Sequence, residues 1–217
     1  MSKKIYLSPS NQIGNKYACG NTNEAEQCNR IAEYARIALQ RCGFEVKKAP
    51  SGQEMHTTVI ESNNWGADLH IPIHTNAGGG EGTVVFVYDK SENNMKYANP
   101  IYKNVQDVSP GTIDYGVRDN SYLYELNATN CVAVYVEVDF HDSVQIANWI
   151  IENVEIIGEA ICKGVCEAYS VKYIPAKAET IYRVQVGSFK VKKNAVAYLD
   201  KVKKSGFKDA FIVEVKL

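Results

Sequence analysis

The segment Leu69–Ala77, LHIPIHTNA, carries two of the four histidines of the chain, His70 and His74, inside an apolar run. Imidazole is the commonest metal ligand in proteins, so the segment suggests a metal site. Such a run is typical of a buried strand, in which four residues span roughly 13 Å, so the two rings cannot share one ion. His74 precedes the turn Thr75–Gly80 and lies at the carboxyl end of its strand, where open α/β sheets carry their sites. We therefore expect His74 as a ligand and His70 as a structural residue.

Two carboxylates are expected at the same edge of the sheet. Glu24 begins a helix directly after the first strand and its loop. Glu137 ends the apolar segment 132–138, where an unpaired carboxylate is costly and therefore suggests a function. A histidine and a glutamate that hold zinc, an open position for water and a further glutamate as base form the constellation of a zinc hydrolase. The three side chains therefore predict metal-assisted hydrolysis.

Strand-like and helix-like segments alternate along the first 170 or so residues, which predicts an α/β fold: a mostly parallel twisted sheet flanked by helices on both faces. The expected strands are 5–7, 44–47, 68–74, 83–88 and 132–138. The expected helices are 24–41, 57–65, 94–108 and 144–169. The first helix is the clearest, because apolar or small residues recur at helical spacing and Gly43 follows as a C-cap.

The C-terminal segment follows a different pattern. Residues 173–180 contain a proline and break both periodicities, which predicts a linker after a catalytic domain of residues 1–172. Residues 181–217 then alternate as strand 182–186, helix 193–204 and strand 210–215, a small β-α-β appendage. A segment this short cannot bury much apolar core alone, so its apolar face is expected to pack against further protein.

The composition fits one ordinary globular domain with a small appendage: 217 residues, 45% hydrophobic and 23% charged, with a net charge of −1. A nucleic-acid binder would need a basic surplus, and no apolar segment is long enough to span a bilayer, so we expect neither nucleic acid nor a membrane as partner. The six cysteines include no Cys-x-x-Cys pair and are expected to be reduced packing residues. Cys162 and Cys166, four apart on an expected helix, have no neighbours in sequence that would complete a zinc site.

Three segments, in this order, resemble the zinc-dependent N-acetylmuramoyl-L-alanine amidases of the amidase-3 type. They are NEAEQCNRIA (23–32), SNNWGADLHIPIHTNA (62–77) and VEVDFHDS (136–143), and the resemblance covers roughly residues 4–170. It implies that Glu24 and His74 bind Zn²⁺ and that Glu137 is the catalytic glutamate. The implied substrate is peptidoglycan, cleaved between N-acetylmuramic acid and the L-alanine of the stem peptide. Zinc would activate a water molecule, and Glu137 would pass its proton to the leaving amine.

One position departs from the family pattern, which has a histidine after the first strand in an Asp-Pro-Gly-His setting. Here the segment is Ser8-Pro9-Ser10-Asn11, and the amide of Asn11 is a poorer zinc ligand than imidazole. Either Asn11 or a water molecule completes the metal site, or another side chain such as His141 substitutes. Two alternatives stay open: a catalytically weak or inactive cell-wall-binding protein on the same fold, and a zinc carboxypeptidase acting on the stem peptide.

The glycine-rich turn after the His74 strand and the polar loop 11–23 are the segments expected to line the substrate groove. Gly78 and Gly79 would let an extended glycan strand approach the backbone closely. Asn76 would either contact the substrate or hold the turn through its side-chain amide.

The tail, residues 181–217, resembles half of a SPOR-type sporulation-related repeat, a module associated with peptidoglycan glycan strands. Arg183 and Gln185 share one face of its first expected strand and are candidate sugar contacts. The complete module contains two β-α-β halves, so two chains, each supplying one half, would make a homodimer.

The N-terminal segment Met1–Pro9 lacks the apolar core of a secretory signal. We therefore expect a protein that is synthesised in the cytoplasm without a signal peptide and acts on the cell wall after release by lysis. The releasing event would be either phage or prophage lysis, as for an endolysin, or mother-cell lysis during sporulation.

Overall fold

The computed structural model describes residues 2–177 and 184–214. The chain divides into two compact units, Met1–Ala176 and Lys177–Leu217. Their boundary lies within the segment 173–180 that the sequence suggests as a linker. Each unit is described by itself.

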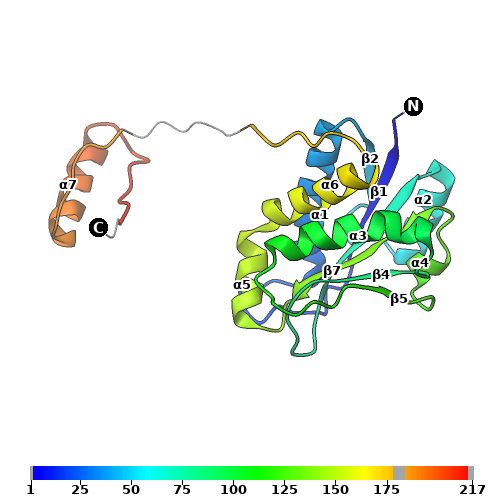
Figure 1. The fold of residues 1–217 in the computed structure, drawn as a ribbon. Coiled ribbons are helices and arrows are strands. Elements are labelled where there is room, and N and C mark those ends of the chain that lie inside the picture. The colour runs from blue at the N-terminus through cyan, green and yellow to red at the C-terminus, as the bar shows by residue number, and fades with distance from the viewer. Residues whose placement is uncertain (1, 178–183, 215–217) are drawn as a thin grey trace. The chain divides into compact units, whose positions relative to one another are not determined.

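The first unit is built on one sheet (Figure 1). Its strands are β1 (Lys4–Pro9), β2 (Glu45–Lys48), β3 (Leu69–Asn76), β4 (Val84–Val87), β5 (Val117–Asp119), β6 (Val132–Ala133) and β7 (Tyr135–Phe140). Their order is β2-β1-β3-β7-β4-β5, with β6 paired to β3. Only the β4–β7 pair is antiparallel among the described strands. The predicted α/β fold with a mostly parallel sheet is therefore confirmed.

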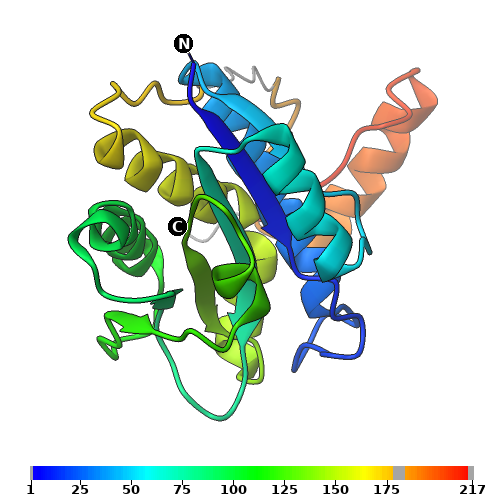
Figure 2. The same ribbon diagram turned by 90° about the vertical axis from the view of Figure 1, so that its right-hand side faces the viewer.

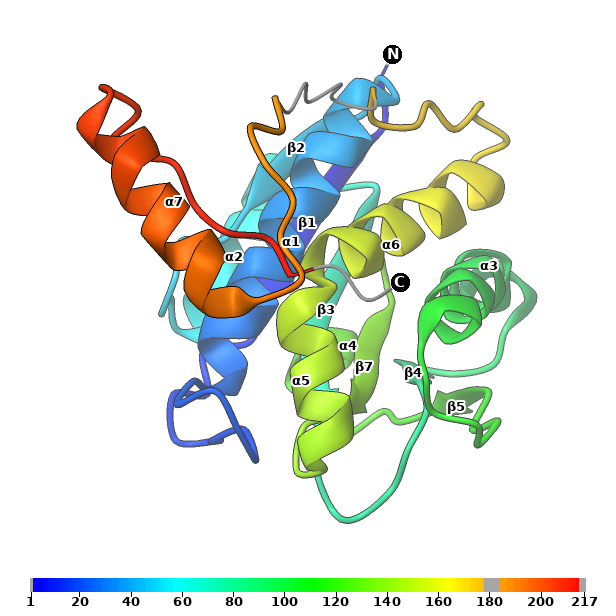
Figure 3. The same ribbon diagram turned by 90° about the vertical axis from the view of Figure 1, so that its left-hand side faces the viewer.

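Helices cover both faces of this sheet. They are α1 (Glu24–Arg41), α2 (Met55–Trp65), α3 (Glu92–Val108), α4 (Tyr124–Asn127), α5 (Val144–Glu152) and α6 (Val154–Ala168). Figure 3 shows α1, α3 and α6 together on one face, where α6 packs against both of the others. Figure 2, seen from the opposite side, shows α2 in front of β1. The core lies between these layers.

Two elements illustrate how the sequence determines the scaffold. The side chain of Asn23 caps α1 by accepting from the backbone N–H of Glu26 at 3.0 Å, and Gly43, with φ 92°, follows the helix end. Strand β3 is buried along its length except at Asn76, because helices cover a mostly parallel sheet on both faces. Together these two elements deliver Glu24 and His74 to the carboxyl edge of the sheet.

The helix expected over 144–169 is two helices. Asn153 interrupts it with φ −120°, and its side chain donates to the carbonyl of Trp149 at 2.7 Å. A polar side chain that bonds a nearby carbonyl competes with the helix, which explains the break. On α6, Gly158 and Gly164 allow close packing: a Cβ on Gly158 would lie 2.7 Å from the backbone nitrogen of Ala35, and one on Gly164 would meet the backbone of α3.

The described part of the second unit contains one helix, α7 (Lys192–Lys204), and no strand. The segments 184–186 and 210–214, expected as strands, are not paired; the expected residues 182, 183 and 215 lie outside the described residues. An isolated two-stranded sheet is marginal in water, which accounts for the difference. Large apolar side chains are exposed along this unit, among them Val184, Phe207 and Phe211. None of the helices that the structure describes has the length and apolar character needed to cross a membrane.

Candidate active site

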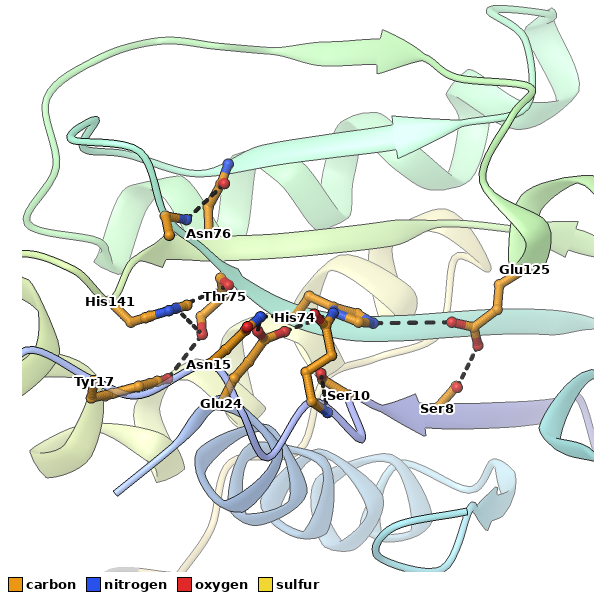
Figure 4. Close-up of polar contacts among 12 residues, drawn as sticks. Ser8, Ser10, Asn15, Tyr17, Glu24, His74, Thr75, Asn76, Glu125 and His141 are labelled. Carbon is orange, nitrogen blue, oxygen red and sulfur yellow. Dashed lines mark hydrogen bonds and ion pairs between the residues drawn. The ribbon is translucent and has the colours of Figure 1, made fainter. Parts of the chain in front are cut away.

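The carboxyl edge of the sheet collects the polar side chains of the first unit (Figure 4). His74 lies near the end of β3, in register with Glu137 on the neighbouring β7. Glu24 is the first residue of α1 and reaches the same edge. The three residues that the sequence places at one edge are therefore neighbours.

His74 and Glu24 form a buried pair. His74 Nδ1 lies 2.8 Å from Glu24 Oε1, and Asn15 donates to Glu24 Oε2 at 2.6 Å. The side chain of Gln12 also reaches this point, with its amide nitrogen 3.3 Å from His74 Nδ1. Burial alone would raise the pKa of Glu24, but hydrogen bonds from His74 and Asn15 lower it below its ordinary value. Glu24 is thus held as a carboxylate.

The opposite side of the His74 ring is held by other groups. The ring stacks on Tyr135 at 4.4 Å, and Nε2 lies 4.0 Å from Glu125 Oε2. Glu125 is itself buried, where it accepts from Ser8 and pairs with His70 Nε2 at 3.0 Å. Burial would lower the pKa of His74, but the Glu24 hydrogen bond and the surrounding carboxylates raise it. His70 is therefore a buried contact of Glu125, and Glu125 faces the candidate ligand.

Glu137 is the carboxylate without a partner. Its Oε2 atom is buried and makes no hydrogen bond within the described part of the chain. Burial raises the pKa of Glu137 to about 7; the charge of His74 opposes this shift and that of Glu24 adds to it. A carboxylate that takes and returns a proton near neutral pH has the property required of a general base.

Comparison with known proteins shows the family. The amidase-3 family model, described as N-acetylmuramoyl-L-alanine amidase, matches residues 9–167, and a SPOR domain model matches residues 168–216. The chain belongs to the N-acetylmuramoyl-L-alanine amidase family. This family is zinc-dependent.

Individual relatives agree with this assignment. The sporulation-specific N-acetylmuramoyl-L-alanine amidase of Bacillus subtilis (strain 168) is 28% identical over 151 residues, which cover 67% of this chain and 57% of the relative. An uncharacterised 38.4 kDa protein of Clostridium perfringens is 32% identical over 178 residues, 76% of this chain and 51% of the relative. The chain thus spans a little over half the length of these relatives. The amidase from Clostridium difficile 630 shares the fold, with a TM-score of 0.70 at 20% identity over 78% of this chain and 97% of that one.

Asn11, which the sequence places where the family has its first histidine, donates through its side-chain nitrogen to the carbonyl of Gln53 at 3.1 Å. His141 lies at the end of β7, where its ring stacks on Tyr17 at 4.8 Å. Its Nδ1 is 3.0 Å from the carbonyl oxygen of Thr75; a carbonyl only accepts, so Nδ1 donates this bond. The contacts of Asn11 and His141 are therefore directed elsewhere, whereas Gln12 contacts His74.

The turn expected to bind substrate is held by its own contacts. Asn76 Oδ1 accepts from the N–H of Ala77 at 2.8 Å, so this side chain does hold the turn. The N–H groups of Gly78 and Gly79 donate to Asp142 Oδ2 at 2.7 and 2.8 Å. Both glycines have positive φ, 123° and 76°, which L side chains rarely adopt.

The two candidate sugar contacts belong to the second unit. Gln185 is exposed, and its side-chain nitrogen lies 3.3 Å from the carbonyl of Gly187. Arg183 lies outside the described residues. The role of both residues stays a prediction.

Sequence reasoning missed three residues of this site. Gln12 directly follows Asn11, so the substitution of the family's histidine was itself a signal to examine the next polar residue. Asn15 lies in the same loop and bridges Gln12 and Glu24 at 2.7 and 2.6 Å. Glu125 gave no such signal, because it lies on a four-residue helix in an irregular segment.

Proposed function

We propose that this chain hydrolyses the amide bond between N-acetylmuramic acid and the L-alanine of the stem peptide in peptidoglycan. The observation that carries the proposal is the buried, unpartnered Oε2 of Glu137, next to a histidine whose Nδ1 faces Glu24. Membership of the amidase family supports the same activity.

The donor set fits Zn²⁺, because carboxylate oxygen and imidazole nitrogen are its usual ligands. His74 Nδ1 cannot donate to Glu24 and accept from Gln12 at the same time, and a cation among the three groups removes this conflict. We assign Glu24 and His74 to hold the ion and the Gln12 amide oxygen as the third donor. In the structure the Gln12 oxygen accepts from Asn15 at 2.7 Å and the nitrogen faces His74, so the amide would turn over to bind the ion. Zinc, when bound, polarises the scissile carbonyl and lowers the pKa of the attacking water.

The protein side chains move the protons. Glu137 accepts a proton from the attacking water while the oxygen of that water forms a bond to the lactyl carbonyl carbon. The same carboxyl then gives the proton to the L-alanine nitrogen as the C–N bond breaks, so that a free amine leaves. Tyr135 and Glu125 fix the orientation of the His74 ring during this sequence.

Substrate binding involves both units, since amidase and SPOR domains both bind peptidoglycan. We assign the turn with Gly78 and Gly79 to the glycan groove, and Arg183 and Gln185 to sugar contacts on the tail. The exposed Val184 and Phe211 would be covered by the tail of a second copy, giving a homodimer. Sedimentation at micromolar concentration tests this: a monomer excludes the pairing, whereas a dimer that Phe211→Asp dissociates supports it.

The cellular setting is part of the proposal. The protein would be synthesised in the cytoplasm and reach the wall after lysis. The SPOR match and the sporulation-specific relative favour mother-cell lysis over phage release. Detection of the protein in the growth medium of intact cells would contradict release by lysis.

The deciding experiment is mass spectrometry of purified Gram-positive peptidoglycan treated with the protein, with and without a chelator. Intact stem peptides with a free L-alanine amine, absent with chelator and with Glu137→Gln, would establish the amidase. Shortened stem peptides would indicate the carboxypeptidase. Binding to the wall without products, even with added zinc, would favour the inactive binding protein.

A further inference from the structure

Three cysteine thiols lie together at the end of α1 remote from the active site. Cys42 is the C-cap of α1, and Cys162 and Cys166 are on α6. Cys162 Sγ is 3.7 Å from Cys42 Sγ and 4.0 Å from Cys166 Sγ, and all three sulfurs lie within 4.8 Å of one another. Since α1 begins at Glu24 and rises about 1.5 Å per residue, roughly 27 Å of helix separates this cluster from the catalytic edge.

The sulfur positions suit a metal ion at their centre. A metal–sulfur bond of about 2.3 Å places the sulfurs of a trigonal site about 4.0 Å apart and those of a tetrahedral site about 3.8 Å apart. A disulfide would instead require a sulfur–sulfur distance of about 2.05 Å and movement of the packed helices. The separations of 3.7 and 4.0 Å from Cys162 match those between metal ligands.

Burial raises the pKa of Cys42, and contact with Cys166 and burial raise that of Cys162, whereas the surroundings favour negative charge at Cys166. The backbone N–H of Ile174 donates to Cys42 Sγ at 3.3 Å. Hydrogen bonding from Cys162 lowers the pKa of Cys166 to about 7, against the effect of burial and with a further contribution from the Arg41 guanidinium. Arg41 is held in place by Glu159, with contacts of 2.7 and 2.6 Å. These contacts ease the ionisation of Cys166 within the cluster.

We propose that Cys42, Cys162 and Cys166 form a binding site for one thiophilic d¹⁰ metal ion, Cu(I). Thiolates select Cu(I) and Zn²⁺ among the first-row ions. A closed zinc site takes four ligands, but within the described residues no fourth His, Cys, Asp or Glu joins the three cysteines. Cu(I) accepts three sulfurs in a plane, so it matches this cluster without a further donor.

Binding requires no redox partner, because the ion enters as Cu(I) and leaves the sulfurs in the thiolate state. Each thiol that still carries its proton releases it to solvent as its bond to copper forms. The three sulfurs lie where α1, α6 and the segment at Ile174 meet. The ion would therefore tie together the two helices and the start of the connection to the second unit.

The test is a competition between the full-length reduced protein and the chromogenic Cu(I) chelator bathocuproine disulfonate, under anaerobic conditions. We expect the wild type to retain one equivalent of Cu(I). Cys162→Ala should weaken binding by more than the roughly 10–100-fold that losing an outer partner of a metal site costs. Cys131→Ser, which removes a cysteine outside the cluster, is the matched control and should bind as the wild type does.

A second measurement keeps the result interpretable if Cys162→Ala folds poorly. Cu(I) should raise the thermal unfolding midpoint of the wild type and of Cys131→Ser, but not that of the milder variant Cys42→Ser. Equal retention of copper by wild type and both cluster variants would overturn the proposal. So would an air-formed disulfide within the cluster, with no Cu(I) retained by the reduced protein.

Discussion

The two ends of α1 carry two kinds of side-chain cluster. At the amino end, Glu24 pairs with His74, which Gln12 also contacts, and Asn15 donates to both Glu24 and Gln12. At the carboxyl end, Cys42 meets Cys162 and Cys166, which are fully or nearly fully buried by helix packing. A catalytic metal site keeps a position open, whereas a structural one is closed by protein ligands. One helix thus serves an open oxygen and nitrogen site and a closed sulfur site.

The difference has a physical origin. Strand ends at the carboxyl edge leave loops that supply amides such as Asn15, which compensate the cost of burying a carboxylate. Gly158 brings α1 and α6 close together, and apolar and sulfur-containing side chains fill most of the space between them, with the Arg41–Glu159 ion pair beside the cysteines. Charge compensation at that end falls to Arg41 and one backbone N–H.

The largest expected effect is a loss of kcat when the active site is changed, with no such loss when the cysteine cluster is changed. Glu137→Gln should lower kcat for release of stem peptides by roughly 10²–10⁴-fold, the usual contribution of a general base or acid. Cys162→Ala should leave kcat essentially unchanged. The measurement is initial rates on purified peptidoglycan, followed by the appearance of free L-alanine amines. A comparable loss in both variants would show that the two ends of α1 are functionally linked.

Much of the scaffold followed from local patterns in the sequence. The periodicity of α1 with Gly43 after its end, and the continuous apolar run of β3, identified the elements that carry Glu24 and His74. The break at Asn153 was missed for two reasons. Apolar residues continue at helical spacing on both sides of it, and a single asparagine is not by itself a signal that a helix ends. The prediction of two strands in the tail was wrong for the described residues. Alternating apolar and polar residues form a strand only where a partner strand is present.

Within the site, residue type and position at strand ends were enough to bring His74, Glu24 and Glu137 to one edge. Glu125 was not predictable, because its helix has four residues and no periodicity. The cysteine cluster was not predictable either: Cys162 and Cys166 looked like packing residues, and their third member, Cys42, is 120 residues before Cys162. Only packing of α6 on α1 brings these residues together.

The next effect concerns the free energy of unfolding of the metal-free protein. The pKa of Glu137 is raised from 4.5 to about 7 by burial, so the folded state holds this proton more tightly than the unfolded state. The associated stability is complete below about pH 4.5 and is lost as the pH rises towards about 7. The loss is on the order of 3 kcal/mol, and Glu137→Gln should lack it.

Urea unfolding with chelator at several pH values between 4.5 and 8 provides the measurement. The wild type should lose stability relative to Glu137→Gln across this window, whereas Cys42→Ser should follow the wild type. Parallel curves for wild type and Glu137→Gln would mean that Glu137 is not buried as a carboxylic acid.

A smaller effect tests which side chain is the third ligand of the site formed by Glu24 and His74. Gln12→Ala should weaken Zn²⁺ binding by at least the roughly 10–100-fold that losing an outer partner costs, because it removes the amide assigned as the third donor beside His74. Asn11→Ala should leave the affinity nearly unchanged, since this side chain contacts the Gln53 carbonyl instead. Isothermal titration with Zn²⁺ compares the two variants. If Asn11→Ala were the weaker binder, Asn11 would take the place of the family's histidine.

The smallest effect tests the turn with Gly78 and Gly79, which lies at the active-site end of the sheet and not at the cysteine cluster. Asp142→Ala removes the acceptor of the Gly78 and Gly79 N–H groups and should lower kcat/KM about fivefold, the equivalent of roughly 1 kcal/mol. The change should appear as a higher KM with kcat retained, because Glu137 and the metal ligands are untouched. Asp119→Ala, an exposed aspartate on β5, is the control. A fall in kcat with constant KM would instead place this turn in the chemical step, and the open site would then extend from His74 to Asp142.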